Sequence, residues 1–199
     1  MRAQFIISFI FFTIFLHAQH ANCDLRKDTD DIKVYTCKTE NEKFRSLIAE
    51  FELKDTSPDE LQKFLWDVKG YVNWQYNMVE SEMLSETNAN ELNYRSLIDA
   101  PWPVENRELV LNFKIERNAG GMMIYIRHTE GENPPPDNVV RVPYFDGIWT
   151  VTVDGKNLKV TYKLKIDPGG SVPAWLANLA MAEGPYVSFK KLKEQIEKK

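Results

Sequence analysis

The chain has 199 residues, a formal net charge of -4, 43% hydrophobic residues and 27% charged residues. These values fit one globular domain with a full hydrophobic core. They argue against nucleic acid as a partner, because there is no excess of positive charge to neutralise a phosphate backbone.

The first 21 residues have the pattern of a secretory signal peptide. Arg2 precedes an apolar run over residues 5–16, and Ala18 or Ala21 offers a small residue for cleavage. The run is shorter than the roughly 20 residues that a membrane span needs. We expect residues 1–21 to be removed and residues 22–199 to form a single exported, monomeric domain, either periplasmic or extracellular. The alternative is an N-terminal helix that stays in place.

Cys23 and Cys37 both lie near the start of the expected mature chain. An oxidising compartment would permit a disulfide that ties down this end, but pairing depends on geometry and stays open at this point. Two thiols without neighbouring histidines do not form a metal site. The sequence therefore predicts no metal and no cofactor.

The mature chain begins with strands and then turns helical. Residues 32–36 and 45–54 are predicted strands, and the second has an apolar face made of Leu47, Ala49, Phe51 and Leu53. A helix is predicted within residues 56–74, because Ser57 can cap it and the apolar residues then recur at helical spacing: Leu61, Leu65, Val68 and Val72.

Residues 108–116 and 157–167 alternate between apolar and polar side chains with period two. This pattern predicts an antiparallel sheet with one dry face, with turns at Gly120-Gly121 and Asp154-Gly155 and a loop at residues 130–138. The dry face would carry the rows Leu109, Leu111, Phe113 and Ile115; Tyr162, Leu164 and Ile166; and, if Trp149 points inward, Trp149, Val151 and Val153. For residues 122–126, the alternation does not choose between Met122 with Ile124 and Met123 with Tyr125.

The last helix has an apolar side that would cover the dry face. Ser171 can cap it, and Trp175, Leu179 and Ala182 lie at helical spacing. Gly184-Pro185 follows, and proline removes a backbone hydrogen bond, so the helix is expected to kink or break there.

Two motifs resemble the START family, the steroidogenic-acute-regulatory-related lipid-transfer domains. They are APWPVENRELV at residues 100–110 and DPGGSVPAWLAN at residues 167–178, with Val140-Arg141 and Gly147-Ile148-Trp149 between them. The similarity covers the chain from about residue 31 onward. It implies an α+β helix-grip fold, in which a curved antiparallel sheet wraps around a long C-terminal helix and leaves an internal hydrophobic tunnel. It also implies one bound hydrophobic molecule, a sterol, phospholipid or similar lipid, and a gate formed by the last helix.

The residues that the resemblance and the alternation together assign to the tunnel are Trp74, Leu109, Leu111, Phe113, Tyr125, Trp149, Tyr162, Leu164, Trp175 and Leu179. Some family members place a charge inside for a polar headgroup, and the candidates here are Arg95, Arg107 and Arg127. Phe113 stands where such a basic residue can occur. That departure favours a neutral ligand, or one whose headgroup stays near the mouth.

No catalytic residue is predicted. His128 is the one histidine outside the expected signal peptide, and we expect it at the surface or rim of the domain. No nucleophile motif such as G-x-S-x-G accompanies it. A non-enzymatic lipid carrier is therefore the first hypothesis, with transient membrane contact through the loop at Pro134 and the rim near Trp175. The alternatives are a cyclase or esterase using the same tunnel, and an interaction module whose own side chains fill the cavity.

Overall fold

The computed structural model describes residues 22–38 and 43–197. The predicted signal peptide (residues 1–21) lies outside these ranges, as do the last two residues of the predicted domain. Within them, one sheet is built from the strands β1 (Cys23–Thr29), β2 (Ile32–Cys37), β3 (Ser46–Leu53), β4 (Met78–Asn88), β5 (Glu91–Ile98), β6 (Asn106–Asn118), β7 (Gly121–His128), β8 (Val139–Arg141), β9 (Tyr144–Asp154) and β10 (Asn157–Asp167).

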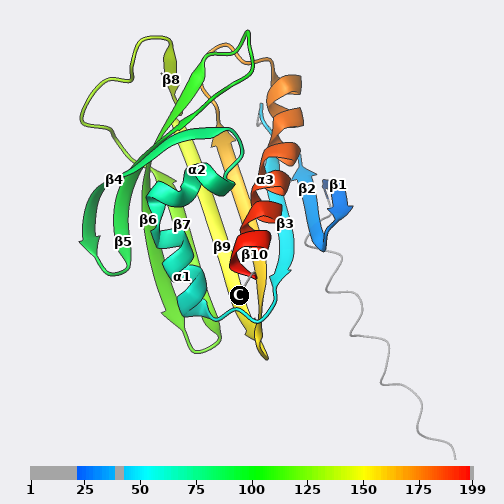
Figure 1. The fold of residues 1–199 in the computed structure, drawn as a ribbon. Coiled ribbons are helices and arrows are strands. Elements are labelled where there is room, and N and C mark those ends of the chain that lie inside the picture. The colour runs from blue at the N-terminus through cyan, green and yellow to red at the C-terminus, as the bar shows by residue number, and fades with distance from the viewer. Residues whose placement is uncertain (1–21, 39–42, 198–199) are drawn as a thin grey trace, which may run out of the picture.

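The sheet has the order β1-β2-β3-β10-β9-β7-β6-β5-β4, and neighbours in this order are antiparallel. β8 instead pairs in parallel with the first three residues of β6, beyond the point where β7 ends. The sheet curves, and α3 (Ala174–Ile196) lies across its concave side, which we call the inner face (Figure 1). The predicted α+β helix-grip architecture is confirmed.

Two short helices replace the single helix predicted within residues 56–74. α1 (Pro58–Trp66) begins with a capping box, in which Ser57 Oγ accepts from the Glu60 N–H and Glu60 Oε2 accepts from the Ser57 N–H. The chain leaves the helical conformation at Asp67, whose carboxylate accepts a hydrogen bond from the Gly70 N–H. A 3-10 turn (Val68–Gly70) and α2 (Tyr71–Trp74) follow. This change of direction leaves Val72 exposed, although helical spacing predicts it buried.

The last helix differs from its prediction at its start. It begins at Ala174 with Pro173 as its N-cap, and Ser171 does not cap it. Pro185 lies inside the helix, so the helix does not break there, and the alternative of a kink at this position stays a prediction. Ahead of it, Gly169 and Gly170 have φ values of 66° and 61°, a region that favours glycine, and the Gly169 N–H donates to Asp167 Oδ1. The Asp-Pro-Gly-Gly segment is thus a turn that aims α3 onto the sheet.

The hydrophobic core lies between the inner face and the three helices. The predicted rows are buried there, except for Ile166, which is partly buried and packs against the core, and Val153, which is exposed near the hairpin end of β9. From the helices, the buried side chains are Leu61, Leu65, Tyr71, Trp74, Met181, Ala182, Phe189, Leu192 and Ile196. In the part of the chain that the structure describes, no helix has both the length and the apolar character to cross a membrane.

Candidate functional site

The structure resolves which phase of β7 points inward. Met122, Ile124 and Ile126 are buried on the inner face, and Ile124 pairs with Trp149 across the β7–β9 ladder. Tyr125 therefore points to the outer face, where the Arg127 guanidinium lies 4.9 Å from its ring centroid. The prediction that Tyr125 lines the tunnel is wrong. Period-two alternation cannot reveal this, since both phases of this strand are apolar.

Four aromatic rings meet beneath α3 at the centre of the inner face. Phe189 of α3 stacks on Phe51 of β3 with ring centroids 4.8 Å apart, and it meets the edges of Trp149 and Tyr162 at 5.4 and 5.3 Å. Trp149 and Tyr162 are paired neighbours on β9 and β10, with centroids 5.2 Å apart. Two of the predicted site residues thus lie side by side under the helix.

A second aromatic group lies where α1 and α2 meet the sheet. Trp74 contacts the rings of Phe64 and Tyr71, and Tyr71 in turn meets the edge of Tyr94 on β5. Trp74 also borders a pocket of about 390 Å³, together with Phe64 and Ile196. The predicted site residue Trp74 therefore lies where α2 meets the end of α3.

The remaining inward predictions on β6 and β10 are buried as expected: Leu109, Leu111, Phe113 and Leu164. Between β6 and α1, the ring of Phe113 meets that of Trp66 at 5.8 Å. β5 contributes Leu92, Tyr94 and Ser96 to the same face, opposite Phe113, Leu111 and Leu109. The alternation of β5 carries these three positions in the sequence, and it is the signal that could have found Tyr94.

Burial raises the pKa of the Tyr94 phenol and that of the Tyr162 phenol well above the ordinary value for tyrosine, because a phenolate would lose its hydration there. The Tyr94 phenol adds to the shift at Tyr162. Both side chains therefore stay neutral and present hydroxyl groups to the interior at any physiological pH.

Two buried side-chain nitrogen atoms have no hydrogen-bond partner in the described residues: Trp149 Nε1 and His128 Nδ1. His128 is the last residue of β7 and pairs with Leu111, so it belongs to the inner face at the rim of the sheet. Its Nε2 is 3.9 Å from the exposed Glu130 carboxylate. Both unpartnered atoms thus belong to side chains on the same concave surface.

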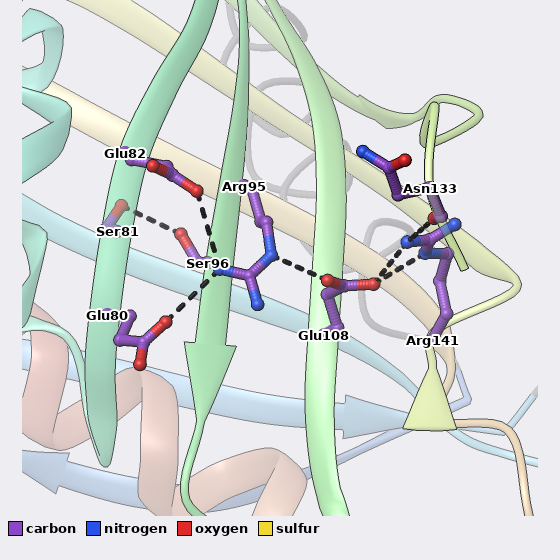
Figure 2. A network of polar contacts seen from close by, with 8 residues as sticks. All are labelled: Glu80, Ser81, Glu82, Arg95, Ser96, Glu108, Asn133 and Arg141. Atoms are coloured by element: carbon purple, nitrogen blue, oxygen red, sulfur yellow. Dashed lines mark hydrogen bonds and ion pairs between the residues drawn. The ribbon is translucent and has the colours of Figure 1, made fainter. Parts of the chain in front are cut away.

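Arg95, one of the three candidate headgroup ligands, lies on the opposite, outer face. Its Nε donates to Glu108 at 2.6 Å, and the other carboxylate oxygen of Glu108 accepts from Arg141 Nε at 2.7 Å. Figure 2 shows Glu108 between the two guanidinium groups, with Glu80 and Glu82 on the far side of Arg95. Arg141 also donates to the Asn133 carbonyl at 2.6 Å. The network therefore connects the loop at residues 130–138 to the sheet.

The other two arginines do not point into the interior as free charges either. Arg127 is exposed on the outer face and donates to Asp146 at 3.2 Å. Arg107 is buried, but its guanidinium donates to the carbonyls of Pro168 at 2.7 Å and Gly169 at 3.3 Å. It holds the turn that precedes α3. The prediction of an inward charge for a headgroup is wrong for Arg95 and Arg127, which lie on the outer face, whereas Arg107 is buried and bound to main-chain carbonyls.

α3 is held along both halves. In the first half, Asn178 Oδ1 accepts from the Arg45 N–H at 3.0 Å and Glu183 pairs with Lys27 at 2.8 Å. The second half has further contacts. Ser188 Oγ accepts from the Tyr76 N–H at 2.9 Å, and Lys193 Nζ donates to the Glu52 carbonyl at 2.6 Å. Asp30, in the β1–β2 turn, binds both Tyr186 and Lys190. Cys23 and Cys37 form a disulfide across this hairpin, so the pairing left open above is present. The β1–β2 hairpin, β3 and the turn after α2 thus hold the helix beyond Pro185.

The first half of α3 contains the two remaining predicted site residues. Trp175 is 70% exposed and does not contact the interior, so its assignment to the tunnel is wrong: the helix turns this side chain outward. The side chain of Leu179 lies outside what the structure describes. The described residues contain no cluster of histidine, cysteine or carboxylate side chains that could hold a metal ion.

Comparison with known proteins places this geometry in a family. The family model of the START domain matches residues 24–196. An uncharacterized protein of Pseudomonas aeruginosa is 32% identical over 181 residues, which cover 88% of this chain and 87% of that protein. A STAR-related lipid transfer protein fragment from Xanthomonas axonopodis superposes with a TM-score of 0.81 at 32% identity, over 89% of this chain and 99% of that one.

Human STARD10 shares the fold at a TM-score of 0.75 and 17% identity, over 92% of this chain and 77% of that chain. The match to the family model spans nearly all of the described residues, and it includes both motifs that prompted the resemblance. This chain belongs to the START domain family.

Proposed function

We propose that the protein binds one hydrophobic molecule, a sterol, phospholipid or similar lipid, between the inner face and α3, and that it carries this molecule between membranes. Family membership supports a lipid-binding role. The observation that carries the proposal is the inner face itself, whose apolar and aromatic side chains converge beneath one helix. Each methylene buried there stabilises a lipid by about 0.8 kcal/mol, so a short acyl segment suffices for firm binding.

We further propose that α3 acts as the gate and moves at its first half. The contacts of Ser188, Lys190 and Lys193 hold the second half, and Pro185 removes one backbone hydrogen bond at the boundary. Movement of the first half would release the Arg45–Asn178 hydrogen bond and the Lys27–Glu183 ion pair. The loop between β5 and β6 and the start of α3 lie at the same end of the molecule (Figure 1). We call this end of the molecule the rim. Opening of α3 at the rim would expose the interior to solvent or to a membrane.

A carrier fits the interior better than an enzyme does. Tyr94, Tyr162 and His128 are the ionisable side chains described above on the inner face. The raised pKa of Tyr94 and of Tyr162 keeps each phenol protonated. A phenol that holds its proton cannot act as a general base at neutral pH.

We propose an exported, monomeric protein, because residues 1–21 have the signal-peptide pattern and the disulfide joins the first strands after it. Disulfides persist in oxidising compartments such as a periplasm or the extracellular medium.

The full chain, secreted from a host and purified without detergent, tests the lipid proposal. We expect solvent extraction followed by mass spectrometry to yield about one lipid per protein molecule, and mass analysis of the intact chain to show cleavage near residue 21. A chain that carries no lipid and takes up neither fluorescent sterol nor fluorescent phospholipid would contradict the carrier function. Retention of residues 1–21 would contradict export alone.

Transient membrane contact is expected at the rim, where two tryptophans are exposed. Trp102, in the β5–β6 loop, is 92% exposed and Trp175 is 70% exposed. Indole rings partition to the membrane interface, so the double change Trp102→Ala with Trp175→Ala should slow lipid transfer to phosphatidylcholine vesicles severalfold. Leu84→Ala, at an exposed site on β4, is the matched control. Equal transfer rates in all three proteins would refute contact at this rim.

A further inference from the structure

We infer that the bound molecule carries an uncharged oxygen, a carbonyl or a hydroxyl, that accepts a hydrogen bond from Nε1 of Trp149. The inference rests on the proposed function and narrows it to a class of ligand: neutral lipids with an acceptor group within their apolar length, as distinct from lipids whose head is a phosphate. Three features of the inner face support it.

The first feature is the unmet hydrogen-bonding capacity of Trp149. Its side chain is only 3% exposed, and Nε1 has no partner in the described residues. The indole N–H can only donate, so no rearrangement of its own can satisfy it. A buried donor without a partner is unfavourable, and native structures contain few of them without a functional reason. An acceptor on a ligand removes that cost only in the complex.

The second feature is the phenol of Tyr162 beside this indole. Gly147 lies two residues before Trp149 on the same face, and a Cβ added there would stand 3.1 Å from Tyr162 Oη. Glycine therefore allows the phenol to lie against β9, next to the indole ring. Because the pKa of Tyr162 is raised, this hydroxyl remains a second neutral hydrogen-bonding group near the first. His128 Nδ1, the other unpartnered atom, marks the rim end of the same face.

The third feature is the location of the positive charges. Arg95 and Arg127 bind carboxylates on the outer face, and Arg107 binds carbonyls of the turn before α3. A phosphate drawn into the centre of the inner face would lose its hydration and meet only neutral donors there. Burying an unpaired ionised group is far more costly than burying a carbonyl. The interior is thus matched to a neutral acceptor.

The test follows the Trp149 indole signal in proton–nitrogen correlation spectra of the delipidated protein. The probes are methyl oleate and 1-octadecene, which share a long unsaturated chain but differ in the ester. We expect methyl oleate to bind about fivefold or more tightly and to shift the Trp149 signal downfield, whereas 1-octadecene leaves the signal near its free position. Trp149→Phe identifies the signal and should abolish the preference between the probes. Trp66→Phe, which also removes an indole N–H, should keep it.

A second pair tests the charge. Dioleoylglycerol should bind more tightly than dioleoyl phosphatidate, which has the same acyl chains and an added phosphate. Tighter binding of phosphatidate would overturn the inference, as would equal binding of methyl oleate and 1-octadecene with an unmoved Trp149 signal; in both cases lipid binding itself would stand. Failure of all four probes to bind would overturn the inference, and the proposed function would fall with it if fluorescent sterol and fluorescent phospholipid were not taken up either.

Discussion

Replacing Phe189 with alanine is expected to lower the free energy of unfolding by about 3–5 kcal/mol. The ring is 3% exposed and contacts Phe51, Trp149 and Tyr162, so its removal leaves a cavity at the place where α3 meets the sheet. These aromatic contacts add to the transfer free energy of the ring itself. Urea unfolding followed by circular dichroism measures the change.

The matched control for Phe189→Ala is Trp175→Ala, a larger truncation on the same helix. Because Trp175 is 70% exposed, we expect its removal to change the free energy of unfolding by about 0.5 kcal/mol or less. If the two variants lost similar stability, Phe189 would not anchor α3. In that case the contacts at Asp30 and Tyr76 would carry the attachment of the helix.

Replacing Glu108 with glutamine is expected to cost about 2–4 kcal/mol, although the two side chains have nearly the same shape. The Glu108 carboxylate is 2% exposed and is the shared partner of Arg95 and Arg141. The amide cannot balance the two positive charges, and its N–H₂ group would face a guanidinium donor. Breaking one member of a buried ionic network is costly for this reason.

Glu82→Gln is the control for this network, since Glu82 also pairs with Arg95 but its side chain is 57% exposed. Exposed pairs contribute about 0–1 kcal/mol. We also expect Glu108→Gln to speed proteolysis within residues 129–143, because Arg141 links Glu108 to Asn133 (Figure 2). Equal stabilities of the two variants, with unchanged proteolysis, would show that the network does not hold the loop.

Local pattern was enough to predict the architecture. The strict alternation of β6 and β10 identifies an antiparallel sheet with one dry face, and the structure buries the side chains on that face, with Ile166 only partly buried. The motifs around Arg107 and the Asp-Pro-Gly-Gly turn indicate the family, and the two segments contact each other through Arg107 and the Pro168 carbonyl. These predictions succeed because each depends on residues a few positions apart.

The candidate site was predicted less well, because its properties depend on pairings between distant segments. Tyr125 could not be assigned to a face, since the strand is apolar in both phases and only the register with β6 and β9 decides. Arg95 looks like an available charge in the sequence. Its role changes when Glu108, thirteen residues away, pairs with it on the outer face.

The sequence by itself determined the strand periodicity, the turn residues and the apolar helix faces of this protein, because backbone sterics and side-chain spacing act locally. Only the tertiary structure decided which polar groups are satisfied. Whether Trp149 Nε1 has a partner depends on what Phe51, Tyr162 and Phe189 bring around it from three other elements. Hydrogen bonding in a core is a property of the assembled fold, since partners must meet within about 3 Å and at the right angle.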